Sequence, residues 1–302
     1  MRATCPWLTW VGRESLAVII ALGALAAPAF GASSTVLFPK PLHLVRTVED
    51  PLAHGPSTVH EYCAGNQVIT VSGSRVAVAD YDKQQLTEID REAGTYSVTP
   101  FDEVAKANAK MQGAKPATRA AKAADGETWK ATQLGVRAAA SGRSLDSWEL
   151  VRGDAREKTT IEVGIDRRVA LSRDAVEVLV GASYPNARSE EHDALLRAAG
   201  GGVVQERRQP TSNSNVAPHP SPLPAERGEG TYGLPVEQVF TFESQGERVA
   251  VRNSIREVNE ELPPAELLII PPGSKLVESH TARLMRELRE ADELPNQPPS
   301  RP

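Results

Sequence analysis

The side chains best suited to chemistry gather in one short stretch, HGPSTVHEYC, which holds His54, His60, Glu61 and Cys63. Imidazole and thiolate groups bind soft metals, so a metal site is conceivable there. In a strand over residues 57–63, however, His60 and Cys63 lie three positions apart and point to opposite faces. We therefore expect an ordinary strand with a buried thiol and no cofactor, with His54, His60 and Cys63 as the nearest approach to a metal site.

The rest of the sequence offers no catalytic motif: we find no nucleophile elbow, no phosphate-binding loop and no HExxH. Asp80 and Asp82 flank Tyr81 at a predicted turn, and Glu190 and Glu191 open a predicted helix. Solvated turn and cap residues explain both acidic pairs. Because no acid, base and nucleophile converge, the sequence predicts a protein that is not an enzyme.

The first 31 residues have the three-part pattern of a secretory signal peptide. Arg2 and Arg13 precede an apolar run, Leu16 to Ala27, and small residues around Ala29-Phe30-Gly31 offer a cleavage site. The run is shorter than the roughly 20 apolar residues that span a bilayer. We expect a periplasmic or secreted protein with no transmembrane span in the mature chain; an uncleaved membrane anchor is the alternative.

Removal of this leader would leave Cys63 as the sole cysteine, which rules out an internal disulfide framework. A lone thiol is either buried or paired between chains, and burial is the commoner fate. The formal charge of −5 becomes −6, because the leader carries Arg2 and Arg13 against Glu14. This acidity argues against nucleic acid and against an anionic membrane surface as partners.

Residues 43–98 have the pattern of an antiparallel meander of short β-rich runs. Ser72-Gly73-Ser74 and Glu92-Ala93-Gly94 separate neighbouring runs, and glycine supplies the positive φ that tight hairpins need. A helix is then predicted, with Thr99 as N-cap, Pro100 at the first position and Gly113 as its end. Its apolar face is predicted to hold Phe101, Val104, Ala105, Asn108 and Met111.

The middle of the chain alternates between ordered and unordered patterns. Residues 113–127 are small and basic, which predicts a flexible loop. Strands are predicted over 147–153 and 158–171, and a helix over 189–200. Residues 175–184 are ambiguous: Val176, Val178 and Val180 alternate as in a strand, the preferred interpretation, while Ser172 and Asp174 could begin a helix.

Residues 209–230 are rich in proline, serine and asparagine and lack apolar periodicity, so they do not offset the entropy of ordering. Their core, SPLPAERGEG, resembles peptides read in frame from interspersed bacterial DNA repeats, which implies a tolerated insertion. The alternative is a proline-rich ligand for a partner.

The C-terminal region predicts a β-hairpin around SQGE with one dry and one wet face. One polar residue lies within the apolar face of each strand: Gln238 in the first and Asn253 in the second. A further strand is predicted to end at Ile270-Pro271-Pro272-Gly273, because proline cannot donate ladder hydrogen bonds. Residues 281–302 are predicted to form a short amphipathic helix and a disordered tail. The apolar positions of the hairpin faces are Leu234, Val236, Phe240, Phe242, Val249, Val251 and Ile255, and those of the helix are Leu284, Met285, Leu288 and Ala291.

Three motifs of this region, Gly233-Leu234-Pro235, Leu262-Pro263-Pro264 and Ile270-Pro271-Pro272-Gly273, resemble secreted bacterial proteins of the lipoprotein-localisation-factor superfamily. The run from Gly65 to Val98 also resembles their strands, whereas Ser274 replaces the usual aromatic residue. The resemblance implies an α+β fold: a curved antiparallel half-barrel, here a single domain over residues 35–280, with helices on its concave side. The space between sheet and helices would hold an acyl chain or a partner's apolar segment.

These observations predict a non-catalytic carrier or binding protein of the cell envelope for a lipid or lipoprotein ligand. The seven apolar residues of the two hairpin faces are the candidate lining of its cavity. The alternative is an envelope interaction module that uses the sheet as a scaffold, without a ligand cavity, and binds another envelope protein.

Overall fold

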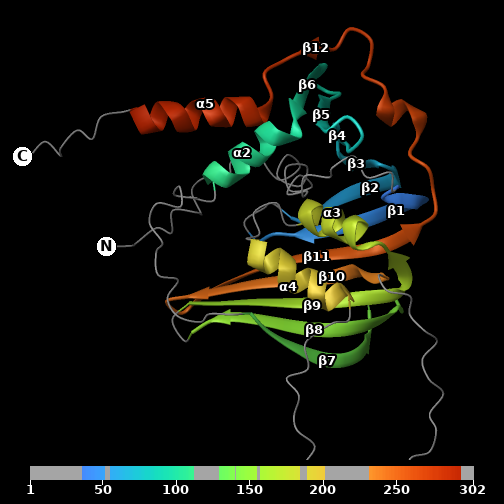
Figure 1. Cartoon of the computed structure of the whole chain (residues 1–302), viewed down its shortest axis with the longest axis vertical. Helices are drawn as coiled ribbons and strands as arrows, with labels where there is room; N and C mark the ends of the chain where they lie inside the picture. The colour runs from blue at the N-terminus through green and yellow to red at the C-terminus, as the bar shows by residue number, and fades with distance from the viewer. Residues whose placement is uncertain are drawn as a thin grey trace, which may run out of the picture.

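A single curved sheet organises the protein, and it belongs to the α+β class that the sequence predicts (Figure 1). The computed structural model describes residues 36–51, 55–111, 129–139, 141–154, 157–183, 189–200 and 231–293. Over these residues the sheet has twelve strands in the order β12-β6-β5-β4-β3-β2-β1-β11-β10-β9-β8-β7. The predicted signal peptide, the 113–127 loop, the 209–230 insertion and the C-terminal tail lie outside the described residues.

The first half of the sheet is the predicted antiparallel meander. Both predicted hairpin turns are confirmed, with Gly73 at φ +59° between β3 and β4 and Gly94 at φ +63° between β5 and β6. From β2 to β6 the registers run without a shift, so each of these side chains can be assigned to a face. In β1 the register shifts between Phe38 and Leu42 and between Val45 and Arg46. The strands are β1 (Phe38–Glu49), β2 (Ser57–Gly65), β3 (Gln67–Ser72), β4 (Arg75–Asp80), β5 (Gln85–Asp90) and β6 (Thr95–Pro100).

The helix after the meander, α2 (Phe101–Met111), begins later than predicted. Thr99 and Pro100 end β6, where they pair with Leu86 and Gln85, so neither caps the helix. The buried face holds Phe101, Val104 and Asn108 as predicted, but Ala107 replaces the exposed Ala105. Pairing with β5 decides the boundary, since tertiary hydrogen bonds override local capping preference.

Two helices pack over part of the other end of the sheet, while its outermost strand is mostly exposed (Figure 1). Three strands form this end. They are β7 (Lys130–Ala138), β8 (Ser144–Gly153) and β9 (Glu157–Leu171), followed by α3 (Arg173–Ser183) and α4 (Ser189–Gly200). The preferred strand over residues 175–184 is therefore wrong. Ser172 Oγ accepts a hydrogen bond from the Ala175 N–H at 3.1 Å, so it starts a helix.

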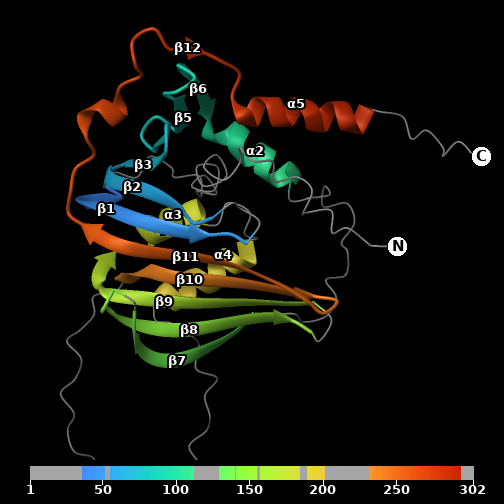
Figure 2. The ribbon, with the colours of Figure 1, turned by 180° about the vertical axis from the view of Figure 1, so that it is seen from behind.

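The predicted C-terminal hairpin is confirmed as β10 (Tyr232–Ser244) and β11 (Glu247–Asn259), with Gly246 at φ +85° in its turn. β11 pairs with β1 and β10 pairs with β9, so the hairpin joins the two halves of the sheet. Because of this pairing, the concave face of the sheet is continuous across the middle of the molecule. The view from behind shows the strands in front of α3 and α4 (Figure 2).

The segment from residue 260 to residue 279, here called the strap, leads from β11 past the meander to the opposite end of the sheet (Figures 1 and 2). The strand predicted before Pro271 is wrong: residues 265–268 form a 3₁₀ turn, η1 (Ala265–Leu268). After the Pro272-Gly273 turn, β12 (Lys275–Leu276) pairs in parallel with β6, and the predicted helix follows as α5 (His280–Glu293).

The sequence predicts a sheet with one buried face and one solvent-exposed face, but the strap covers part of the face that is expected to be exposed. Its Leu267 is 7% exposed and packs with Ile69, Val76, Val78 and Ile89 on the convex face of the meander. On the concave face, Val68 and Leu86 pack with Phe101 and Val104 of α2. The meander is therefore buried on both sides, which residue alternation alone does not predict.

Candidate binding site on the concave face

Four polar side chains cross the concave face in neighbouring strands. They form a belt that consists of Glu61 on β2, Arg46 on β1, Asn253 on β11 and Gln238 on β10. Arg46 Nη2 donates to Glu61 Oε2 at 2.7 Å, and Arg46 Nη1 donates to Asn253 Oδ1 at 3.0 Å. Gln238 lies directly opposite Asn253 in the strand register. Sheet pairing thus aligns residues that are as much as 207 positions apart in sequence.

Apolar rows border the belt on both sides, because each belt residue alternates with core residues along its strand. Leu44, Cys63 and Ile255 belong to the larger core cluster on one side. On the other side, Val48 and Val59 pack with Val251. The belt is therefore a polar line across an apolar surface, the composition typical of ligand sites with a few placed polar groups.

The belt residues are almost completely inaccessible. Glu61 is 0%, Gln238 1%, Arg46 2% and Asn253 6% exposed. Within the described part of the chain, three buried belt atoms have no hydrogen-bond partner: Arg46 Nε, Glu61 Oε1 and Gln238 Oε1. Most buried polar groups are hydrogen-bonded, because an unpaired one costs about 1–3 kcal/mol. These atoms therefore form one donor and two acceptors to which a guest group could bond.

Cys63 lies next to the belt on β2 and is free and fully buried, as the sequence predicts. Burial raises the pKa of its thiol well above the usual value, and the negative charge of Glu61 raises it further. The opposing effect of Arg46 is smaller. Because the thiolate is the nucleophilic form, this thiol is poorly suited to attack a substrate.

The predicted cavity residues divide into two groups. Leu234, Val236, Phe240 and Ile255 are at most 5% exposed and belong to the concave core. Val249 and Val251 are only partly buried, and Phe242 is 47% exposed near the hairpin tip. The hairpin extends beyond α3 and α4, so these helices do not cover the residues near its tip.

Hydrogen bonds from β9 hold α4 on the concave face. Arg167 Nη2 donates to the Ala198 carbonyl at 2.9 Å, and its Nη1 donates to the Ala199 carbonyl. The same guanidinium bonds to Asp146 Oδ2 on β8 through Nε at 2.9 Å. A cation placed at a helix C-terminus also interacts favourably with the helix dipole. Arg167 therefore connects α4 to two strands.

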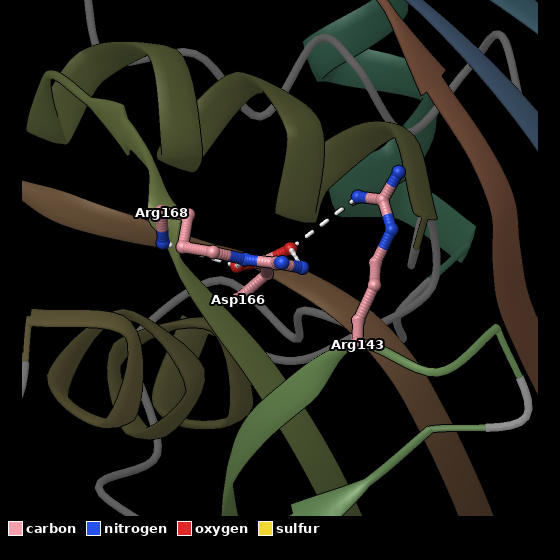
Figure 3. A network of polar contacts seen from close by, with 3 residues as sticks. All are labelled: Arg143, Asp166 and Arg168. Atoms are coloured by element: carbon pink, nitrogen blue, oxygen red, sulfur yellow. Dashed lines mark hydrogen bonds and ion pairs between the residues drawn. The ribbon is translucent and has the colours of Figure 1, made fainter.

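A second polar network lies beside it on β9 (Figure 3). Asp166 is 1% exposed and accepts from Arg168 Nε and Nη2, both at 2.9 Å, and from Arg143 Nη1 at 3.3 Å. Burial by itself would raise the pKa of Asp166, but the Arg168 hydrogen bonds and both positive charges outweigh it and lower the pKa. Its carboxylate oxygens are used by protein partners, so this network is a structural element.

The proposed metal ligands do not come together. His54 lies outside the described residues, and His60 and Cys63 point to opposite faces of β2, as their spacing predicts. On the convex face, His60 Nδ1 lies 3.1 Å from His43 Nε2, and His43 Nδ1 lies 3.1 Å from Glu261 Oε2 at the start of the strap. Among the described residues, no group of three or more His, Cys, Asp or Glu side chains could hold a metal ion.

The sequence alone does not predict the belt as a site. Gln238 and Asn253 are predicted only as polar interruptions of apolar strand faces, Glu61 only as a neighbour of the weak metal candidates, and Arg46 is not singled out. A signal was present, because Arg46 alternates with Leu42, Leu44 and Val48, and Glu61 lies between Val59 and Cys63. A charge at a core position of a strand is unusual unless it is paired.

Comparisons with known proteins give no family assignment. No protein-family model and no curated protein matches the chain. A solved structure of PNGF-II is similar over 83% of this chain and 33% of its own, with 5% identity and a TM-score of 0.34. The structure of MucB in complex with MucA(peri) is similar over 87% of this chain and 61% of its own, with 9% identity and a TM-score of 0.32.

These likenesses are too weak to support an argument about function, since both TM-scores are below 0.5. The chain also spans about a third of the first structure and about three fifths of the second. Separately, none of the helices in the described ranges combines the length and the apolar character needed to cross a membrane.

Proposed function

We propose that this chain is a non-catalytic binding protein of the cell envelope that holds a lipid-like ligand against its concave face. The observation that carries the proposal is the polar belt within the apolar concave layer. Its orphaned atoms, Arg46 Nε, Glu61 Oε1 and Gln238 Oε1, suit the ester or hydroxyl groups of an amphiphile. The flanking rows of aliphatic side chains suit its acyl chain.

The proposed envelope location is supported by the signal-peptide pattern of residues 1–31. The proposed absence of catalysis is supported by the raised pKa of the Cys63 thiol and by the lack of a catalytic motif in the sequence. Because every belt residue is less than a tenth exposed, binding requires an opening movement of the elements that cover the belt. The helices α3 and α4, which pack on one side of the sheet, are the candidates for that movement.

Native mass spectrometry with lipid extraction tests this function on the purified full chain. We expect a fraction of the molecules to carry an acyl lipid, and the stripped protein to take up the fluorescent fatty acid cis-parinaric acid. A ligand-free mass together with no uptake of the fatty acid would contradict the proposal. The alternative function, a protein-interaction module, would then be preferred.

A further inference from the structure

The strap exposes a row of large aliphatic side chains at the meander end of the molecule. Their exposed fractions lie between 37% and 65%, which is unusual for five neighbouring residues of this kind. They bracket the Pro271–Gly273 turn and are here called the ridge. The ridge consists of Leu268, Ile269, Ile270, Leu276 and Val277.

The ridge is presented on an anchored backbone. Beside it, Leu267 is buried in the convex cluster, and Arg91 Nη2 donates to the Glu266 carbonyl at 2.8 Å. Beyond the turn, the Lys275 N–H donates to the Gly94 carbonyl and the Val277 N–H donates to the Tyr96 carbonyl, both at 2.9 Å. Tyr96 also packs against the cluster that contains Leu267, so the strap is anchored beside β6 on both sides of the turn.

The strap is acidic. Between residues 260 and 279 it carries Glu260, Glu261, Glu266 and Glu278 against Lys275, a net charge of −3. Burial raises the pKa of the Tyr62 phenol on the underlying strand, and the charges of Glu261 and Glu266 raise it further. Glu278 is paired with Arg286 at 2.7 Å. Arg91 lies at the Glu266 backbone and His43 lies beside Glu261. The strap itself therefore keeps its net negative charge, and three of its four glutamates precede the ridge in the chain.

We propose that the ridge is a docking surface for a basic amphipathic segment of another protein, one that presents aliphatic side chains beside lysine or arginine. The aliphatic side chains would cover the ridge, and the cations would approach Glu260, Glu261 and Glu266. The anchored strap lowers the entropy cost of association because its backbone is already ordered. This surface lies on the strap and on the edge strand β12, away from the belt strands β2, β1, β11 and β10, so it adds a function to the proposed one.

Charge selects this occupant over two others. A second copy of this chain would place one acidic strap against another, and like charges across an interface oppose association. An anionic lipid surface would be repelled in the same way. A basic segment gains from the same carboxylates, so its binding should weaken as salt is added.

Fluorescence anisotropy on the full chain tests the proposal with two fluorescein-labelled helical peptides. One carries leucine and lysine on opposite faces, and the other has glutamate in place of every lysine. We expect the lysine peptide to bind at least about ten-fold more tightly. Leu268→Ser with Leu276→Ser should weaken that binding by about ten-fold or more, with an unchanged circular dichroism spectrum because both side chains are exposed.

Leu134→Ser with Val136→Ser is the matched control, because these β7 side chains are 58% and 69% exposed at the other end of the sheet. This variant should bind like the wild type. Glu260→Gln with Glu266→Gln should remove the preference for lysine. Equal binding of the two peptides, or a ridge variant that binds like the wild type, would overturn the proposal. The proposal would also be overturned if the wild type formed a dimer, or bound phosphatidylglycerol vesicles, and the Leu268→Ser, Leu276→Ser variant did not.

Discussion

Two buried carboxylates of the described residues, Asp166 and Glu61, differ in how completely their oxygens are paired. Asp166 is surrounded by donors from Arg143 and Arg168 that use both of its oxygens. Glu61, by contrast, bonds to Arg46 through one oxygen and keeps the other unpaired, although it is completely buried. A charge whose partners are complete stabilises the fold, whereas the unpaired oxygen of Glu61 is what the proposed binding site rests on.

Asp166→Asn should destabilise the protein at neutral pH and have little effect in acid. The folded-state pKa of Asp166 is lowered, so its stabilising contribution is present above the unfolded value of about 4 and is lost as the pH falls through the folded value. We expect a loss of about 1–2 kcal/mol at pH 7, since charge-assisted hydrogen bonds are replaced by neutral ones. Urea unfolding at pH 7, 5 and 3 measures it.

Asp102→Asn is the control for this prediction, because Asp102 pairs with Lys106 in a solvent-exposed i,i+4 pair. Exposed pairs contribute little to stability, so this variant should unfold like the wild type throughout. An Asp166→Asn effect of the same size at pH 3 and pH 7 would contradict the assigned role of the carboxylate.

At the scale of elements, local patterns predicted strands and turns better than helix boundaries. Gly73, Gly94 and Gly246 mark hairpin turns that need positive φ, and all of these turns are confirmed. In α3 the pattern is misleading: Val176 and Val180 face one core cluster while Val178 faces the other, so alternating valines fit a helix buried on two sides. A sequence alone does not show that a helix has two buried faces.

The strap shows a different limit. Ile269-Ile270 before two prolines resembles the end of a strand, yet only Leu267 of this region is inserted into the core. The partner surface is formed by Ile69, Val76, Val78 and Ile89, which are contributed by three strands far away in sequence. Several adjacent aliphatic residues could have been inserted there. The shape of that surface, and not local propensity, determines that Leu267 is the one inserted.

Leu267→Ala should cost about 2–4 kcal/mol of unfolding free energy, because it leaves a cavity under the strap. Ile269→Ala is the matched control, since this side chain is 58% exposed and should change stability by less than about 0.5 kcal/mol. Urea unfolding measures both, and limited proteolysis of the strap should accelerate in the first variant alone. Equal stabilities would show that Leu267 is not the anchor.

At the scale of the whole molecule, the decisive contact is the antiparallel pairing of β1 with β11. It joins the N-terminal meander to the C-terminal hairpin and brings Arg46 within hydrogen-bond distance of Asn253. The residue patterns predict an antiparallel meander and a C-terminal hairpin, and the resemblance implies the curvature of the sheet, but neither predicts the order of its strands. Because this pairing is long-range, local alternation marks Gln238 and Asn253 one at a time and does not indicate the belt that they form with Arg46 and Glu61.

The comparison that tests the central claim most directly uses Arg46→Met with Glu61→Leu. Hydrophobic replacement of a buried ion pair is often neutral or stabilising, whereas Arg46→Ala alone should cost about 3–5 kcal/mol because Glu61 loses its partner. If the belt serves a ligand, the double variant should unfold at the same or a higher urea concentration, yet bind cis-parinaric acid at least about ten-fold more weakly. Unchanged fatty-acid binding in this stable variant would contradict the account.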